Sequence, residues 1–155
     1  MAVSDHLVKR AERATSNERH PVPVTRRAAD IEVSRGLAAA GVLLSAVVHL
    51  DLWDLQRFRD IPTIGPLFLL NVVAGVVIGV VMLVWRHWLP MLAGAGFGAA
   101  TVGAFWISVV HGLFGLKETA TGSSQVLAEV AEYVAVVFGL LAAALLWNEA
   151  RRQNR

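Results

Sequence analysis

The sequence contains no cysteine, and only 17% of its residues are charged. The absence of cysteine excludes disulfide bonds, thiolate metal sites, iron–sulfur clusters and covalent c-type haem attachment. The chain also lacks a Gly-x-Ser-x-Gly elbow, a His-Glu-x-x-His helix and a phosphate-binding glycine loop. Catalysis by an activated nucleophile therefore has little support.

What the chain has in abundance is apolar surface: 55% of its residues are hydrophobic, and its mean hydropathy is +0.55. Its 155 residues allow one domain at most. This composition is typical of a polytopic membrane protein and not of a soluble enzyme. Arginine far outnumbers lysine, and alanine, valine and glycine dominate the apolar set. We interpret that bias as GC-rich codon usage, which indicates a bacterial source.

Long apolar segments predict membrane spans at residues 33–55, 64–85, 88–116 and 124–147. Each has the length of roughly 20 residues that a helix needs to cross a bilayer. The connections between them are short, and short connections force neighbouring helices to run antiparallel. We therefore predict an all-α, up-down-up-down bundle of four transmembrane helices.

The basic residues predict how this bundle lies in the membrane. We divide the chain into a basic N-terminal tail (1–35), a transmembrane domain (36–148) and a basic C-terminal tail (149–155). On the predicted topology, most of the lysines and arginines lie on the side that holds both termini. The positive-inside rule then predicts a multi-pass protein of the bacterial cytoplasmic membrane with both termini cytoplasmic. We expect the tails to contact anionic lipid head groups and not nucleic acid. A helix is possible from Ser4 to about Thr15.

Small residues recur four apart within the spans: Gly41 and Ser45, Gly75 and Gly79, Gly94 and Gly98, Ala99 and Gly103. Helices in a bilayer associate through close packing and interhelical polar contacts, so such pairs favour close backbone approach. They predict contacts within the bundle, or with a second copy or another membrane subunit.

Ionisable residues in the spans mark the place to look for a site, because charge in hydrocarbon is costly. Six of them fall toward the predicted non-cytoplasmic side: His49, Asp51, Asp54, His111, Glu129 and Glu132. Helical spacing places His49, Glu129 and Glu132 in the interior, with His111 above them. Asp51 and Asp54 are expected to point elsewhere. Tyr133 continues the polar stripe of the fourth span, and Asn71 lies deeper, where it could hydrogen-bond across helices.

Three interpretations of this constellation stay open. The first is structural: Asp54 pairs with Arg57, and His49 hydrogen-bonds Glu129 or Glu132. The second is a metal site built by His49, Glu129 and Glu132, with Asp51 as a further candidate ligand. The third is a bis-histidine haem b between His49 and His111, or a proton relay through the carboxyls, which would suit a small proton-coupled carrier acting as an oligomer.

Two stretches carry a resemblance: Val-Val-His-Leu-x-Leu-Trp at 47–53 and Arg-x-Ile-Pro-Thr-Ile-Gly-Pro-Leu-Phe-Leu-Leu-Asn at 59–71. With Gly-Leu-Phe-Gly-Leu-Lys-Glu at 112–118, they resemble small four-helix bacterial integral membrane proteins of unassigned function, over residues 36–147. The resemblance implies that His49, 61–71 and 111–118 face one another, and it implies no activity. We therefore expect a non-enzymatic membrane subunit or binding module that docks onto itself or onto a larger membrane complex. The alternatives are a metal- or haem-binding redox protein and a small proton-coupled carrier that acts as an oligomer.

Overall fold

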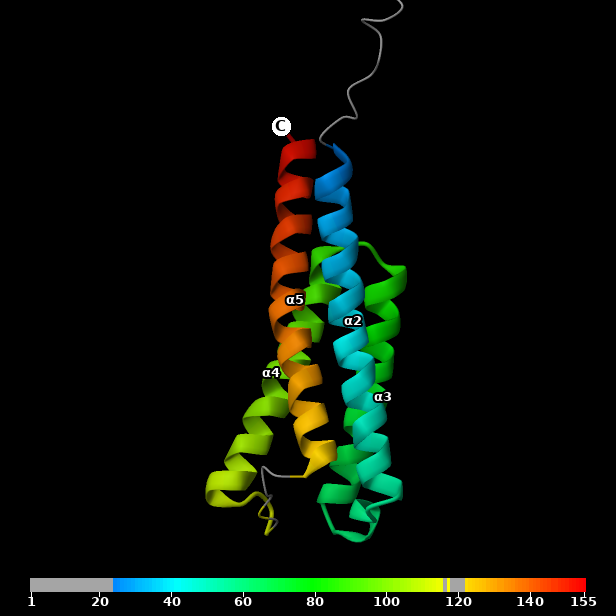
Figure 1. The fold of residues 1–155 in the computed structure, drawn as a ribbon, viewed down its shortest axis with the longest axis vertical. Helices are drawn as coiled ribbons and strands as arrows, with labels where there is room; N and C mark the ends of the chain where they lie inside the picture. Colours follow the sequence, from blue (N-terminus) through cyan, green and yellow to red (C-terminus); the bar gives the residue numbers. More distant parts are fainter. Residues whose placement is uncertain (1–23, 116, 118–121) are drawn as a thin grey trace, which may run out of the picture. The chain divides into compact units, whose positions relative to one another are not determined.

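The computed structural model describes residues 24–115, 117 and 122–155. It divides into residues 1–30 and residues 31–155, and the described part of the first unit is only the start of helix α2. The elements in chain order are α2 (Val24–Asp54), the short 3-10 helix η1 (Phe58–Asp60), α3 (Ile64–Val84), α4 (Trp88–His111) and α5 (Ser123–Gln153). Within residues 31–155 the long helices run up and down beside one another (Figure 1). The predicted helix possible at Ser4–Thr15 lies outside the described residues.

All four long helices are long and apolar enough to cross a membrane. The prediction of an all-α, four-helix bundle is therefore confirmed, and the chain is a multi-pass membrane protein. Large apolar side chains such as Val47, Leu70 and Val137 are exposed on its flanks, at 63%, 62% and 58%. Exposure of this kind suits helices whose outward faces meet lipid.

The helix ends differ from the predicted ends at three places. Helix α2 begins at Val24, not near residue 33, so residues assigned to the basic tail are helical, and Ile31 is buried. Helix α4 ends at His111, five residues before the predicted end, because Gly112 takes a positive φ of 79° that a helix cannot continue. Helix α5 runs on to Gln153 and not to about residue 147.

Small residues fill the centre of the bundle. The buried core is rich in alanine, and its members include Ala38, Ala39, Ala135 and Ala142. Glycines bring backbones into contact: a Cβ on Gly41 would lie 2.6 Å from the carbonyl oxygen of Ala131, so α2 and α5 pack directly against each other. Close packing of this kind replaces the hydrophobic effect, which gives little association between helices in lipid.

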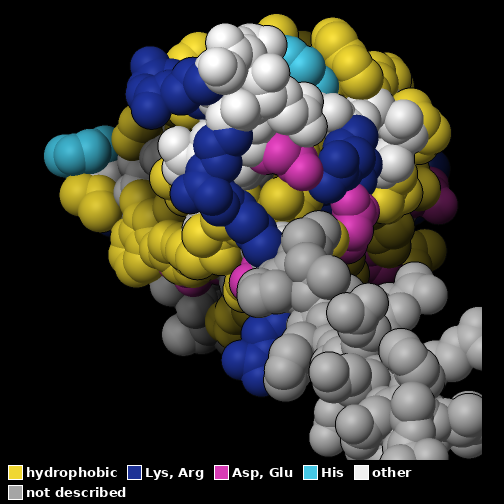
Figure 2. Space-filling view, turned by 90° about the horizontal axis from the view of Figure 1, so that it is seen from above, with side chains coloured by type: hydrophobic (Ala, Val, Ile, Leu, Met, Phe, Trp, Pro, Cys, Tyr) yellow, Lys and Arg dark blue, Asp and Glu magenta, His cyan; other side chains and the backbone are white. Residues whose placement is uncertain are grey.

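One end of the bundle, the Arg86 end, carries a network of ion pairs around the turn between α3 and α4. Arg86 contacts Glu32 at 3.0 Å and Glu149 at 3.3 Å. Arg35 is 7% exposed; it contacts Glu32 at 2.7 Å and donates to the carbonyl oxygen of Met82 at 3.1 Å. The view onto this end shows basic and acidic side chains gathered together, with hydrophobic side chains around them (Figure 2). The network ties α2, α5 and the α3–α4 turn together.

Candidate binding pocket

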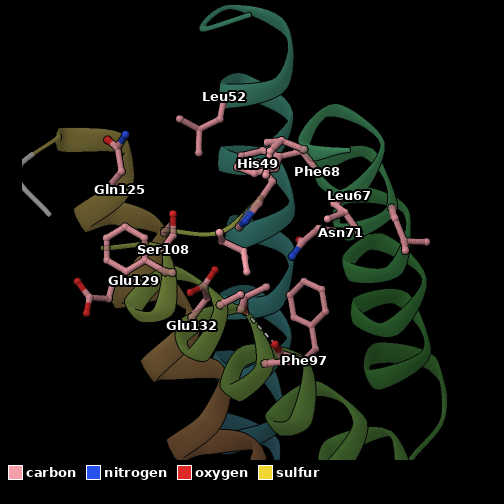
Figure 3. Close-up of a pocket in the computed structure, with 18 of the residues that line it drawn as sticks. His49, Leu52, Leu67, Phe68, Asn71, Phe97, Ser108, Gln125, Glu129 and Glu132 are labelled. Atoms are coloured by element: carbon pink, nitrogen blue, oxygen red, sulfur yellow. Dashed lines mark hydrogen bonds between the residues drawn. The ribbon is translucent and has the colours of Figure 1, made fainter. Parts of the chain in front are cut away.

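The opposite end of the bundle, called here the pocket end, holds the end of α2, the start of α3, the end of α4 and the start of α5. A cavity of about 350 Å³ lies here, and all four long helices contribute to its wall. Figure 3 shows the side chains that converge on it. Its lining is mostly apolar, with the polar side chains His49, Asn71, Thr101, Ser108, Gln125, Glu129 and Glu132. A mostly apolar pocket with a few polar groups is the usual form of a small-molecule site.

His49 and Ser45 stand one helical turn apart on α2, on the face that meets the pocket and α5. The His49 Nδ1 lies 2.8 Å from the Ser45 carbonyl oxygen, which can only accept, so Nδ1 carries the proton. In a neutral imidazole the Nε2 atom is then a hydrogen-bond acceptor. The backbone of α2 therefore selects the tautomer of His49.

Glu132 on α5 is the most deeply buried carboxyl of the pocket, at 3% exposure. The Ser45 hydroxyl donates to its Oε1 at 3.0 Å, and the same Oγ lies 3.4 Å from His49 Nδ1. Among the described residues, no Lys, Arg or His forms an ion pair with Glu132. Ser45 thus joins the two predicted interior residues, which do not form the direct hydrogen bond expected between them.

Asn71 and Phe68 extend the pocket on α3. The Asn71 Oδ1 is buried with no hydrogen-bond partner, so it does not make the cross-helix hydrogen bond suggested by the sequence. The Phe68 ring lies 5.1 Å from the His49 ring and stacks on Phe58 at 5.0 Å. These rings close the pocket toward the α2–α3 connection.

Glu129 lies at the edge of the pocket and not in the interior with Glu132. Its Oε1 accepts from the Trp106 indole at 2.9 Å and from the Tyr133 hydroxyl at 3.2 Å. Tyr133 is 46% exposed and does not line the pocket. No sequence pattern indicates a role for Trp106, because an aromatic residue in a span is equally expected at a lipid-facing position.

The remaining predicted residues lie outside the pocket. His111 is exposed at the end of α4 and is not part of the lining, so it does not cap the interior group. Asp51 accepts a long hydrogen bond from Gln56, at 3.4 Å. Asp54 pairs with Arg59, not with Arg57 as predicted. Arg57 instead pairs with Asp60 at 3.0 Å, because its positive φ of 61° directs the chain into η1.

This arrangement gives no basis for the metal or haem interpretations. Across the described residues, no group of three or more His, Asp or Glu side chains is placed to hold a metal ion. His49 lines the pocket whereas His111 is exposed outside it, so the two imidazoles do not face a common haem site.

The pocket opens on the flank of the bundle, between α3 and α4. These two helices are joined by a short turn at the Arg86 end and diverge toward the pocket end (Figure 1). Leu67 and Leu70 line the pocket and are nevertheless 41% and 62% exposed. Leu67 and Leu70 lie in the first two turns of α3, a helix long and apolar enough to cross a membrane, so an opening beside them suits entry from the lipid side.

Together, the fold and the pocket define a four-helix integral membrane protein with a cavity that opens sideways. Comparison of the chain with protein-family models, curated proteins and solved structures finds no match. The resemblance to small four-helix bacterial membrane proteins therefore stays a prediction.

Proposed function

We propose that this protein is a membrane-embedded binding module for an amphipathic molecule that dissolves in the bilayer and enters the pocket from the side. The observation that carries the proposal is the lining of the pocket: it combines the polar side chains His49, Asn71 and the buried Glu132 with Leu67 and Leu70, which are apolar and exposed. A molecule with a small polar head and an apolar tail would place the head near His49 and Glu132. Its tail would remain between α3 and α4.

The proposal is tested by photolabelling the protein in lipid nanodiscs with an uncharged alkyl benzophenone. Labelling should concentrate on peptides from α3 and α4 that line the pocket. Ala104→Trp, which fills the cavity from α4, should remove that labelling, because Ala104 is part of the lining. Val80→Trp is the matched control, since Val80 is 47% exposed on α3 and is not part of the lining. Equal labelling of both variants would contradict the proposal.

We further propose that the pocket end faces away from the cytoplasm of a bacterium and that the basic tails meet anionic lipid head groups on the cytoplasmic side. The support is the bias of lysine and arginine toward the side of the termini. The cysteine-free chain gives a clean test. Leu55→Cys, at a position that is 74% exposed, should react with a membrane-impermeant maleimide in intact cells. Reaction only after permeabilisation would reverse the orientation.

A binding module of this size can act as a subunit without catalysing a reaction. Docking onto a second copy or onto a larger membrane complex stays a prediction. It is checked by crosslinking the protein in the native membrane and then comparing the mass of the nanodisc particle with and without that crosslinking.

A further inference from the structure

The charge of the pocket restricts the ligand class. Two carboxyl side chains, Glu129 and Glu132, line the cavity together with His49, and none of the lining residues that the structure describes is Lys or Arg. The amide nitrogens of Asn71 and Gln125 add neutral donors but no positive charge. A ligand that carries a phosphate, sulfate or carboxylate would therefore meet like charge and no cation.

Glu132 is the buried carboxyl of the pocket, and no Lys, Arg or His among the described residues forms an ion pair with it. Glu32, Asp54, Asp60 and Glu149 each pair with an arginine, whereas the 3% exposed Glu132 accepts a hydrogen bond from the hydroxyl of Ser45. The Thr101 hydroxyl beside it donates to the backbone carbonyl oxygens of Phe97 and Gly98, at 2.9 and 3.0 Å. A carboxylate in apolar surroundings is costly unless a positive charge compensates it.

The walls of the cavity also favour a cation. Phe68 of α3 and Phe97 and Phe105 of α4 line it, so aromatic rings face the cavity from two of its sides. The faces of aromatic rings attract a cationic nitrogen, most strongly where water is excluded. The His49 Nε2 and the unpartnered Asn71 Oδ1 supply further acceptors for an N–H donor.

Resting on the proposed function, we propose that the ligand is a lipophilic ammonium: one positively charged nitrogen that bears apolar substituents. Its nitrogen pairs with the Glu132 carboxylate, its first substituents contact Phe68, Phe97 and Phe105, and its tail leaves between α3 and α4. In the bound state the ammonium then supplies the positive charge that no described residue pairs with the Glu132 carboxylate.

The test uses the full chain in nanodiscs of zwitterionic phosphatidylcholine, which presents no net lipid charge to the probes. Three probes each carry one benzene ring and one octyl chain: benzyldimethyloctylammonium, its analogue with a neutral quaternary carbon in place of nitrogen, and an octylbenzene sulfonate. Binding is measured by competition with the photoreactive benzophenone. The ammonium should compete at least about tenfold better than the neutral analogue, as expected for a charge-assisted contact. The sulfonate should compete least.

Glu132→Gln keeps the shape of the side chain and removes its charge. It should abolish the preference for the ammonium, while Glu129→Gln, whose carboxyl already binds Trp106 and Tyr133 at the rim, should change it by less than about threefold. The comparison of probes on the unmodified protein needs no variant, so it decides the question even if Glu132→Gln does not fold. If all three probes compete equally, the proposed ligand class is wrong, but the proposed function of the pocket as a binding site is not contradicted. If none of them competes and Ala104→Trp leaves labelling unchanged, the proposed function itself fails.

Discussion

The contact between α4 and α5 at Gly98 gives the sharpest test of the packing. A Cβ added at Gly98 would lie 2.7 Å from the carbonyl oxygen of Glu132, 3.1 Å from Val136 Cγ2 and 3.3 Å from Ala135 Cβ. The nearest of these atoms belongs to the backbone of a helix, which cannot turn aside as a flexible side chain could. The Gly98→Ala substitution must therefore push α4 away from α5 at Glu132, the residue that carries the buried carboxyl.

Gly96 is the matched control on the same helix, since a Cβ there would meet nothing within 4 Å. Replacement of a helix-interior glycine by alanine gains about 0.5–1 kcal/mol of stability from the backbone alone. We expect Gly96→Ala to show that gain. Both variants share this backbone gain, so the difference between their free energies of unfolding isolates the steric cost. That cost is about 1–3 kcal/mol for an overpacked site.

The assay is unfolding of the purified protein by sodium dodecyl sulfate in mixed micelles, followed by far-ultraviolet circular dichroism. Gly98→Ala should have a free energy of unfolding lower than that of Gly96→Ala by about 1–3 kcal/mol. Equal free energies for the two variants would refute the close approach of α4 and α5.

Two further predictions use the same unfolding assay. Ser45→Ala removes the hydroxyl that donates to Glu132 and should lower the free energy of unfolding by about 1–3 kcal/mol, the cost of an unsatisfied buried group; an effect no larger than that of the exposed Ser123→Ala would contradict it. Arg35→Gln removes the hydrogen bonds to the last carbonyl oxygens of α3 and should cost about 1–3 kcal/mol. Arg86→Gln, whose side chain is 46% exposed, should cost less than about 1 kcal/mol, and the reverse order would show that the exposed ion pairs hold this end.

The fold could be predicted from hydropathy because apolar length and short connections leave few arrangements for four helices. The start of α2 could not be predicted from hydropathy. Hydropathy counts Arg35 as a tail residue, whereas the structure buries it, and its Nη2 donates to the carbonyl oxygens of Met82 and Leu83. Those carbonyl oxygens belong to the end of another helix, so no local pattern near Arg35 reveals them.

The site could be predicted in part. Helical spacing predicted that His49 and Glu132 lie in the interior, and both are among the residues that line the pocket. It did not separate Glu129 from Glu132, because residues three apart share a face and the difference is decided by Trp106 of another helix. Nor did it assign a role in the site to Ser45, which was noted only as a small packing residue and yet joins His49 to Glu132.

Residue size changes along α3 and α4 between the two ends of the bundle. Nearer the Arg86 end, small residues allow close packing: a Cβ on Gly94 of α4 would lie 2.5 Å from Met82 Sδ of α3, whereas a Cβ on Gly75 or Gly79 of α3 would meet α2 and one on Gly98 would meet α5. Toward the pocket end the same two helices carry Phe68 and Asn71, and Thr101 and Phe105. Larger side chains hold helix axes further apart, so two helices fixed at one end by a short turn must diverge at the other. The divergence of α3 and α4 at the pocket end therefore accompanies a change in residue size along each helix.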